Sequence, residues 1–495
     1  MDTRTLSDGM QARTDETERD PRRWRALVLL ALVQFMLVLD VTVVNVALPR
    51  IQHDLGFSGP GLAWVVNGYV IMAGGLLLLG GRLADIFGRR RLFLTGVGLF
   101  AVASALCGAA VTPGMLVSSR FVQGIGEALA APAALGLIGL LFPDPRERIK
   151  ALGIWGGLSG LAGVSGVVIS GALTDLASWR WIFFINLPVA LVALVMVPRL
   201  VAESRMVREH GRLDFAGAIT ATAGLVATIE GLLQAASHPW GSWRVLLPLL
   251  GGVALLAAMV VVEARSNAPL IPLRFFHNRT RVVANLSVLF YTAAFLTFVF
   301  LLTLFLQEVL GYSPLKGGLS YVPFGIAIGA GIGLGTGLMP RLGVKPLLCA
   351  GFAGAAAGLL VASTIHVGVS YAAGVLPGML LLGVSSGLVM PSAANAALHG
   401  VTGQDSSLAS GVQTTVQQIG GALGLACLVT LALGHAASEV AHGAAPAVAA
   451  TGGYALAFKI AAALLLVGGV LVMLLLEEVA AQPRNPAAEL TPERR

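Results

Sequence analysis

Apolar runs of about 20 residues recur along almost the whole chain, and they constrain its fold more than any other feature. A helix needs about 20 apolar residues to cross the ~30 Å hydrocarbon core of a bilayer. Such runs predict an all-α membrane protein with fourteen transmembrane helices. The predicted spans are 25–48, 61–80, 92–111, 114–141, 150–173, 181–198, 213–234, 245–263, 282–309, 317–339, 346–365, 369–396, 406–435 and 455–476.

The composition supports the membrane assignment and excludes other classes. Apolar residues make up 56% of the 495 residues and charged residues only 12%, about half the charge of a soluble protein. The net charge of +7 does not indicate nucleic acid binding, because the basic residues lie in short loops between apolar runs. The three cysteines lie singly inside apolar runs, so neither a metal site nor a redox site is expected. No cofactor is expected either.

The distribution of lysine and arginine predicts the orientation. With a cytoplasmic N-terminus, 26 of the 32 basic residues lie in cytoplasmic segments and four in segments on the other side. This asymmetry is what the positive-inside rule expects of an even number of spans. We therefore expect a bacterial inner-membrane protein with both termini in the cytoplasm. No signal peptide is recognised, and the first span is expected to be an uncleaved anchor.

A weak internal repeat suggests two related halves. Glycine-containing loops follow the second and the tenth span, and aligning Gly88 with Gly343 also aligns Gly96 with Gly351. Parallel halves of this kind occur in transporters that bind substrate between the halves. The expected organisation is an N-terminal tail 1–24, a six-helix bundle 25–200, two linker helices 201–275, a second six-helix bundle 276–477 and a C-terminal tail 478–495.

The most specific local motif is the loop GRLADIFGRRR at residues 81–91. It places an acidic residue, Asp85, beside a basic cluster at the predicted cytoplasmic end of a helix. A carboxylate there can pair with an arginine or with the N-terminus of a neighbouring helix. Such a pair can hold one conformation and release in another.

The motifs together resemble the major facilitator superfamily, over about residues 25–475. The 81–91 loop resembles its motif A, which implies a conformational switch formed by Gly81, Asp85, Gly88, Arg89 and Arg90. LDVTVVNVALP at 39–49 is similar to the first-helix signature of fourteen-helix drug:proton antiporters of the EmrB/QacA type. Further matches are RFVQGIG at 120–126, WRWIFFINLP at 179–188, GYSP at 311–314 with Gln307, and QQIGG at 417–421.

The resemblance implies a fold, a function and one departure. The fold would be two six-helix bundles with two additional helices between them. The function would be proton-coupled export of drug-like or antibiotic molecules. The fifth helix departs from the family's antiporter motif, because Val167 replaces its proline and Ser170 one of its glycines, which weakens the inference of antiport. Its small-residue face still predicts close helix packing: Gly156, Gly160, Gly163, Gly166 and Ser170.

Charged residues inside the predicted spans are the candidates for proton coupling. Each costs roughly 2.5–3.5 kcal/mol at the centre of the membrane and so needs a reason. Asp40 lies in the first span, and Arg120, Gln123 and Glu127 share one face of the fourth. Burial raises the pKa of a carboxyl group and a nearby cation lowers it, so a carboxyl that exchanges these environments binds and releases a proton. We expect Asp40 and Glu127 to be protonated in turn, with Arg120 modulating them.

Several polar residues inside spans are candidates for the substrate cavity, although each is equally suited to a hydrogen bond between helices. They are Gln34, Asn45, Gln123, Gln307, Gln413 and Gln417. The expected partners are a small-molecule substrate and the lipid bilayer, and the expected state is a monomer.

Other functions are less compatible with this sequence. An ATP-driven pump would need a GxxxxGK[ST] loop, which the sequence lacks. The scattered histidines do not suggest an intramembrane enzyme, and no repeated filter suggests a channel. Two alternatives stay open: an exporter or facilitator dedicated to one metabolite without proton coupling, and a sensor built on a transporter fold.

Overall fold

The computed structural model describes residues 22–204, 214–266, 277–397 and 406–477, and these residues form helices and no strand. The predicted tails lie almost entirely outside the described residues. The helices are α2 (Arg22–Leu55), α3 (Gly59–Phe87), α4 (Arg89–Gly108), α5 (Pro113–Leu141), α6 (Pro145–Leu176), α7 (Trp181–Phe184), α8 (Asn186–Leu200), α9 (Phe215–Gln234), α10 (Trp243–Arg265), α11 (Arg279–Leu304), η2 (Phe305–Val309), α12 (Pro314–Leu319), α13 (Val322–Leu342), α14 (Val344–Ala362), η3 (Tyr371–Val375), α15 (Leu376–Ala397), α16 (Ser406–Ala441) and α17 (Pro446–Leu475).

Among the described residues, thirteen helical segments are long and apolar enough to cross a membrane. The chain is therefore a multi-pass membrane protein. The predicted fifth span corresponds to α6, of which the part Leu161–Leu176 forms a shorter apolar helix. The sixth span is divided into α7 and α8, and the tenth into α12 and α13. The predicted span 406–435 is a single 36-residue helix that ends at Ala441.

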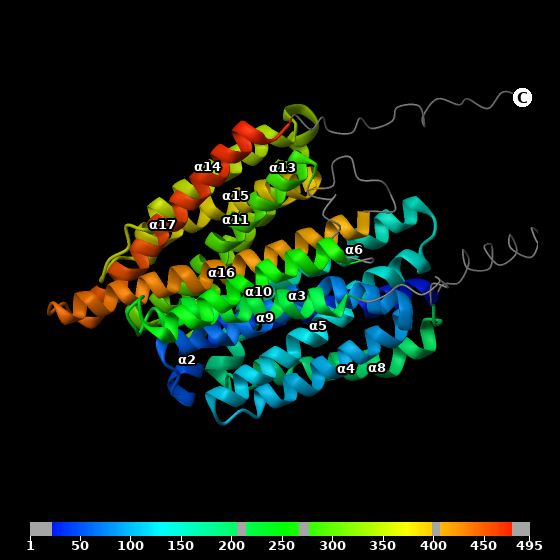
Figure 1. The fold of residues 1–495 in the computed structure, drawn as a ribbon, viewed down its shortest axis with the longest axis horizontal. Helices are drawn as coiled ribbons and strands as arrows, with labels where there is room; N and C mark the ends of the chain where they lie inside the picture. Colours follow the sequence, from blue (N-terminus) through cyan, green and yellow to red (C-terminus); the bar gives the residue numbers. More distant parts are fainter. Residues whose placement is uncertain (1–21, 205–213, 267–276, 398–405, 478–495) are drawn as a thin grey trace, which may run out of the picture.

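The helix contacts repeat between the first and the second half of the chain. In the first half, α2 packs on α6, and α5 packs on both α3 and α4. In the second half, α11 packs on α16, and α15 packs on both α13 and α14. Figure 1 shows α13, α14, α15 and α17 gathered on one side, and α4, α5 and α8 on the other.

The predicted repeat of Gly88 and Gly343 is confirmed by their common role. Each residue ends one helix and precedes the next, with φ of 106° at Gly88 and 80° at Gly343. A side chain would strain both positions, because positive φ is costly for residues other than glycine. The two tight helix connections therefore explain the glycines of the repeated loops.

The helices run between two ends of the molecule, which we call the basic end and the far end. The basic end is where α2 begins at Arg22 and where Arg89, Arg90 and Arg91 start α4. The far end is the opposite one, where α2 ends at Leu55 and α3 begins. The two halves touch near the far end and also along α3 and α16, where Leu78 packs on Gly411. The far-end contact includes η2 and α2. There Gln307 Nε2 of η2 donates a hydrogen bond to the Val46 carbonyl oxygen of α2 at 2.6 Å.

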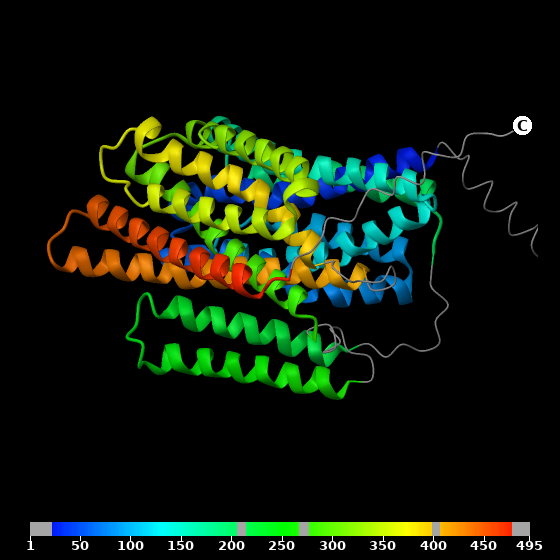
Figure 2. The ribbon, with the colours of Figure 1, turned by 90° about the horizontal axis from the view of Figure 1, so that it is seen from above.

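The two additional helices form a hairpin beside both halves. Figure 2 shows α9 and α10, in green, running side by side along one flank of the molecule. Helix α9 packs against α3 of the first half and against α16 of the second. Thr430 Oγ1 of α16 donates to the Leu232 carbonyl oxygen of α9 at 2.8 Å. The hairpin is thus attached to both halves.

Candidate functional site

The candidate site is centred on Asp40, a carboxylate in the middle of α2 with no exposed surface. Arg120 Nη1 of α5 donates to Asp40 Oδ2 and forms an ion pair with it. Gln123 Nε2 donates to Asp40 Oδ1 at 2.8 Å, and Asn186 Nδ2 of α8 donates to the same oxygen at 2.9 Å. Three donors from two other helices thus surround one buried carboxylate.

Arg120 is buried with Asp40 and is held by several groups. Its Nε donates to the Val65 carbonyl oxygen of α3 at 2.9 Å, and its Nη1 to Gln123 Oε1 at 2.7 Å. Its guanidinium carbon lies 4.2 Å from the centre of the Tyr69 ring. A buried ion pair stabilises a structure only when further hydrogen bonds satisfy both partners. Here those bonds are present.

The network also contains two neutral side chains that sequence reasoning missed: Asn186, which bonds Asp40 directly, and Ser104, which bonds Asp40's amide partners. Ser104 Oγ of α4 accepts from Gln123 Nε2 at 3.1 Å and from Asn186 Nδ2 at 2.9 Å. It donates in turn to the Phe183 carbonyl oxygen of α7 at 3.0 Å. Asn186 lies in the WRWIFFINLP segment, and its place in that motif is the one sequence feature that could have indicated a role for it. The network therefore joins α2, α3, α4, α5, α7 and α8.

Glu127 lies on α5 but does not touch Asp40. It is seven residues from Arg120, two turns or about 10 Å nearer the basic end of the helix. Its Oε2 is buried without a hydrogen-bond partner among the described residues, and so is the hydroxyl of Tyr69. The structure thus brings Asp40, Arg120 and Gln123 into direct contact. Glu127 lies outside this cluster, close to the side chain of Tyr69 that packs on Arg120.

The predicted switch residues meet at the basic end within the first half. Asp85 Oδ1 accepts from Arg89 Nη2 at 2.9 Å, and Arg89 Nη1 donates to the Gly136 carbonyl oxygen of α5 at 3.2 Å. The backbone N–H groups of Arg90 and Arg91 both donate to Glu203, at 3.2 Å. Glu203, which sequence reasoning missed, thus caps the start of α4 with a negative charge.

Gly81 and Gly88 differ in how strictly they require glycine. A Cβ atom at Gly88 would lie 2.6 Å from Glu203 Oε1. The positive φ of Gly88 is a second obstacle to any side chain there. At Gly81 the nearest atom, Pro132 Cβ, would lie at 3.6 Å, which is ordinary contact. Only Gly88 is fixed by its surroundings.

The remaining polar candidates are spread over both halves. Gln307 bonds to Val46 between the halves, and Gln417 Nε2 lies 3.3 Å from Met390 Sδ. Asn45 Nδ2 donates to the Val41 carbonyl oxygen within α2. Gln34 Oε1 and Asn45 Oδ1 are buried without partners among the described residues. Gln413 is half-buried.

The altered antiporter motif keeps close packing between α6 and α2. Ser170 Oγ donates to the Val43 carbonyl oxygen of α2, so the hydroxyl forms an interhelical bond where the motif has glycine. A Cβ atom at Gly166 would clash with Thr42. On the other side of α6, a Cβ atom at Gly171 would lie 2.6 Å from the Pro314 carbonyl oxygen of α12.

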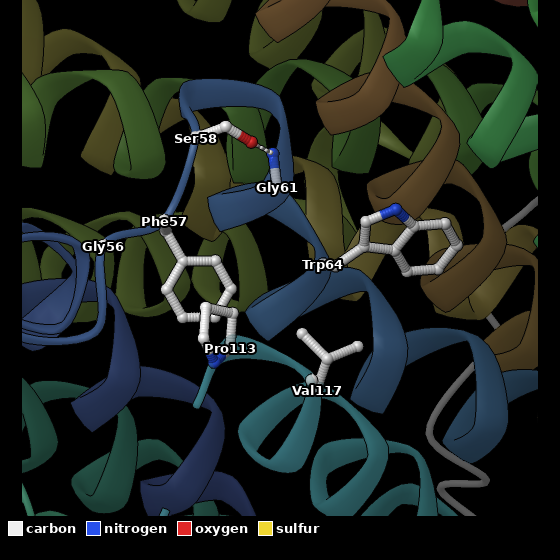
Figure 3. Close-up of a pocket in the computed structure, with 8 residues that line it drawn as sticks. Gly56, Phe57, Ser58, Gly61, Trp64, Pro113 and Val117 are labelled. Carbon is white, nitrogen blue, oxygen red and sulfur yellow. Dashed lines mark hydrogen bonds between the residues drawn. The ribbon is translucent and has the colours of Figure 1, made fainter. Parts of the chain in front are cut away.

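A hollow of about 450 Å³ lies elsewhere, at the far ends of α3 and α5 (Figure 3). It contains none of the predicted site residues. Its lining is mainly apolar: Gly56, Phe57, Ser58, Gly61, Trp64, Pro113, Gly114 and Val117. The indole of Trp64 points away to α9, where its Nε1 donates to Glu230 Oε2 at 3.0 Å. The buried polar network remains the better candidate site, because it concentrates the charged groups.

Known proteins resemble this chain along most of its length. The puromycin resistance protein pur8 of Streptomyces alboniger is 40% identical over 484 residues, 96% of each chain. The lincomycin resistance protein of Streptomyces lincolnensis is 40% identical, covering 84% of this chain and 86% of its own. The cephamycin export protein CmcT of Amycolatopsis lactamdurans is 38% identical, covering 85% and 87%.

Solved structures show the same fold at low sequence identity. A crystal structure of an auto-inhibited POT family peptide transporter has a TM-score of 0.69 at 15% identity, covering 93% of this chain and 98% of its own. The predicted two-bundle, all-helical fold is therefore confirmed. The family model of the Major Facilitator Superfamily matches residues 30–425. On these grounds, the chain belongs to the Major Facilitator Superfamily, a family of transporters and not of enzymes.

Proposed function

We propose that this protein exports antibiotic-like small molecules in exchange for protons, with Asp40 as the proton-binding group. The observation that carries the proposal is a fully buried carboxylate in a spanning helix, ion-paired with Arg120 and bonded to two amides. Ionisable residues inside membrane helices are rare and mark ion and substrate pathways.

Protonation of Asp40 would change every contact in the network. The ionised carboxylate only accepts hydrogen bonds, whereas the protonated one is neutral and becomes a donor at one oxygen. Arg120 would then lose its counter-charge but keep Gln123 Oε1, the Val65 carbonyl and the Tyr69 ring. The attachment of α2 to its own half would loosen.

Helix α2 also carries this change to the other half. Its Val46 carbonyl accepts from Gln307 of η2, one of the contacts that hold the far ends of the halves together. A proton bound at Asp40 therefore biases the interface that must open and close during alternating access. Transport of the proton and of the substrate would be coupled through this one helix.

Glu127 is suited to relay protons between Asp40 and the basic end. It lies about 10 Å from Arg120 along α5. Its unpartnered Oε2 is free to accept a proton, a water molecule or a cationic group. Of the substrate-cavity candidates with unpartnered oxygens, Gln34 lies on α2 between Asp40 and the basic end, and Asn45 lies beyond Asp40, toward the far end.

The remaining parts of the proposal concern location and partners. The basic end would face the cytoplasm, with both termini there, and the membrane would be the bacterial inner membrane. The relatives named for puromycin and lincomycin resistance favour antibiotics as substrates. We propose a monomer that uses the proton as its only coupling ion.

The test is accumulation of a fluorescent cationic dye, and of puromycin, in bacterial cells that express the protein. Cells with the wild-type protein should accumulate less of both compounds, and a protonophore should abolish the difference. Asp40→Asn should behave like the protonophore, because its side chain cannot bind a proton. Asp175→Asn, the same change at an exposed position of α6, serves as the matched control.

Two outcomes would count against the proposal. Export by Asp40→Asn at the wild-type rate would remove Asp40 as the coupling group. Export that resists the protonophore in every variant would exclude the proton as the coupling ion. An unchanged dye level with puromycin export intact would indicate an exporter dedicated to antibiotics such as puromycin, with a narrow substrate range.

A further inference from the structure

Among the residues that the structure describes, the buried amide of Asn67 in a membrane-spanning helix has no hydrogen bond. Asn67 of α3 has no exposed surface. Both its Nδ2 and its Oδ1 are without a partner among the described residues. Most buried asparagines here bond at least once, as Asn45, Asn186 and Asn285 do. Burying a whole amide without compensation is unfavourable, and the bilayer core offers no water to replace the bonds.

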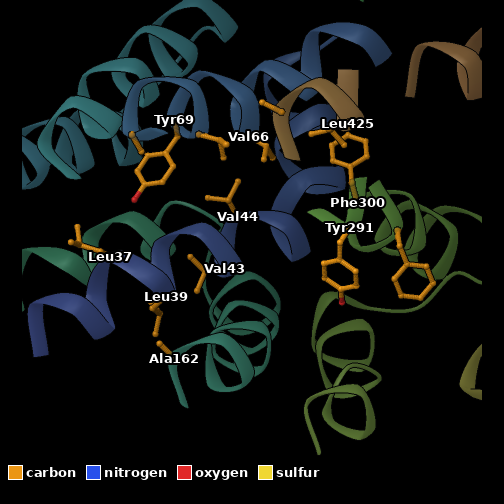
Figure 4. Close-up of a cluster of buried hydrophobic side chains, with 14 of the residues drawn as sticks. Leu37, Leu39, Val43, Val44, Val66, Tyr69, Ala162, Tyr291, Phe300 and Leu425 are labelled. Atoms are coloured by element: carbon orange, nitrogen blue, oxygen red, sulfur yellow. The ribbon is translucent and has the colours of Figure 1, made fainter. Parts of the chain in front are cut away.

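Asn67 faces α16 of the other half. Gly74 is seven residues further along α3 and therefore lies on the same face of the helix as Asn67. Gly74 packs directly on Gln418 of α16. One turn further, Leu78 of α3 packs on Gly411 of α16. Figure 4 shows Val66, the residue before Asn67, in the same buried layer as Leu425 of α16.

The depth of Asn67 places it in the part of the interface nearer the far end. It lies eight residues from the start of α3, or about 12 Å along the helix. The far ends of the halves are in contact in this structure, through Gln307 with Val46 and through α6 with α12. Two polar groups of this region are already engaged, since Trp64 donates to Glu230 and Thr430 to Leu232.

We infer that Asn67 finds its hydrogen-bond partners when the far ends separate, and that it thereby sets the balance between the two conformations. The inference rests on the proposed alternating-access function. In the far-end-closed state the amide is dry and unpaired. In the far-end-open state it lines the opened interface and bonds a donor–acceptor partner, which is water or the amide or hydroxyl group of a departing substrate.

The experiment measures the conformational balance directly. Spin labels are attached at His53→Cys and His366→Cys, both exposed at the far end, one in each half. The native cysteines Cys107, Cys349 and Cys427 are first replaced by alanine. Pulsed electron paramagnetic resonance on the full chain in lipid nanodiscs then gives the populations with short and long distances between the labels.

Asn67→Leu should reduce the ratio of open to closed populations by about tenfold, because leucine needs no partner in the closed state. Asn67→Ser should shift the ratio in the same direction, because its hydroxyl can bond the Ala63 carbonyl one turn earlier. It replaces the leucine variant if that variant is not recovered. Asn395→Leu removes an exposed amide at the basic end and should leave the ratio unchanged.

An unchanged ratio in both Asn67 variants, or a shift toward the open state, would overturn the inference. The measurement needs no transport, so it stands apart from failure of the export test. Added puromycin separates the two partners. If the substrate bonds Asn67, puromycin raises the open population more in wild type than in Asn67→Leu. If water is the partner, the rise is equal in both.

Discussion

At the scale of single residues, the Asp40–Arg120 ion pair links the charge of Asp40 to the packing of α2 on α5. Both side chains are almost completely buried, so each depends on the other for compensation. Breaking a buried pair by removing one partner usually costs more than removing both, because the remaining charge stays unpaired. The pair thus makes the first half of the chain sensitive to one proton.

The first prediction follows from this dependence. Arg120→Leu should lower the free energy of unfolding by roughly 3–5 kcal/mol, because it leaves Asp40 buried without its counter-charge. Adding Asp40→Asn to the same chain should recover part of the loss. Thermal unfolding of the purified variants in detergent measures both effects. A double variant less stable than Arg120→Leu alone would contradict the account.

The charged members of this site could be predicted from the sequence, and the neutral members could not. Asp40 and Arg120 are conspicuous because charges are rare in apolar runs. Ser104 and Asn186 are ordinary small polar residues, and the sequence around each gives no sign that they bond to each other next to Asp40. Glu127 shares the helix face of Arg120, yet it does not contact Asp40 and lies near Arg120 only through the side chain of Tyr69. Periodicity gives the direction of a side chain but not its distance from a residue on another helix.

At the scale of elements, α6 lies between α2 on one side and α12 on the other. Its contact with α12 depends on Gly171, where a Cβ atom would also lie 2.9 Å from Leu315 Cα. The sequence predicted a small-residue face of α6 that ends at Ser170, but not that the next residue, Gly171, would serve the contact between the halves. Gly163, by contrast, has open space around it.

The second prediction concerns this contact. Gly171→Leu should prevent the far ends from closing, because backbone atoms of α12 cannot move away from the new side chain as a flexible side chain could. Spin labels at positions 53 and 366 should then report mainly the long distance. Gly163→Leu, on the same helix, should leave the wild-type distribution. A short distance in Gly171→Leu would show that α6 and α12 do not form the closing contact.

At the scale of the whole molecule, two halves with the same helix contacts meet at the far end and along α3 and α16, and the α9–α10 hairpin is attached to both. The sequence predicted the number and order of most helices, because length and hydropathy suffice for that. It did not predict which flank the hairpin would occupy. That depends on pairs such as Trp64 with Glu230, whose partners are 166 residues apart.

The third prediction tests this attachment. Trp64→Phe should destabilise the protein by roughly 1–3 kcal/mol, because Glu230 loses its indole donor and keeps Gln234 as its one remaining donor among the described residues. Trp240→Phe, at an exposed position of the α9–α10 connection, should be neutral. Thermal unfolding of both variants decides the point. Equal stabilities would mean that the hairpin is held by apolar packing alone.

The central claim is that movement of substrate and proton are coupled through Asp40. The most direct measurement uses purified protein in sealed liposomes that contain a pH-sensitive dye, with a puromycin gradient imposed across the membrane and no initial pH difference. The account predicts that wild type moves protons against the direction of puromycin flow, and that Asp40→Asn moves none while Asp175→Asn behaves like wild type. Proton movement of wild-type size in Asp40→Asn would contradict it.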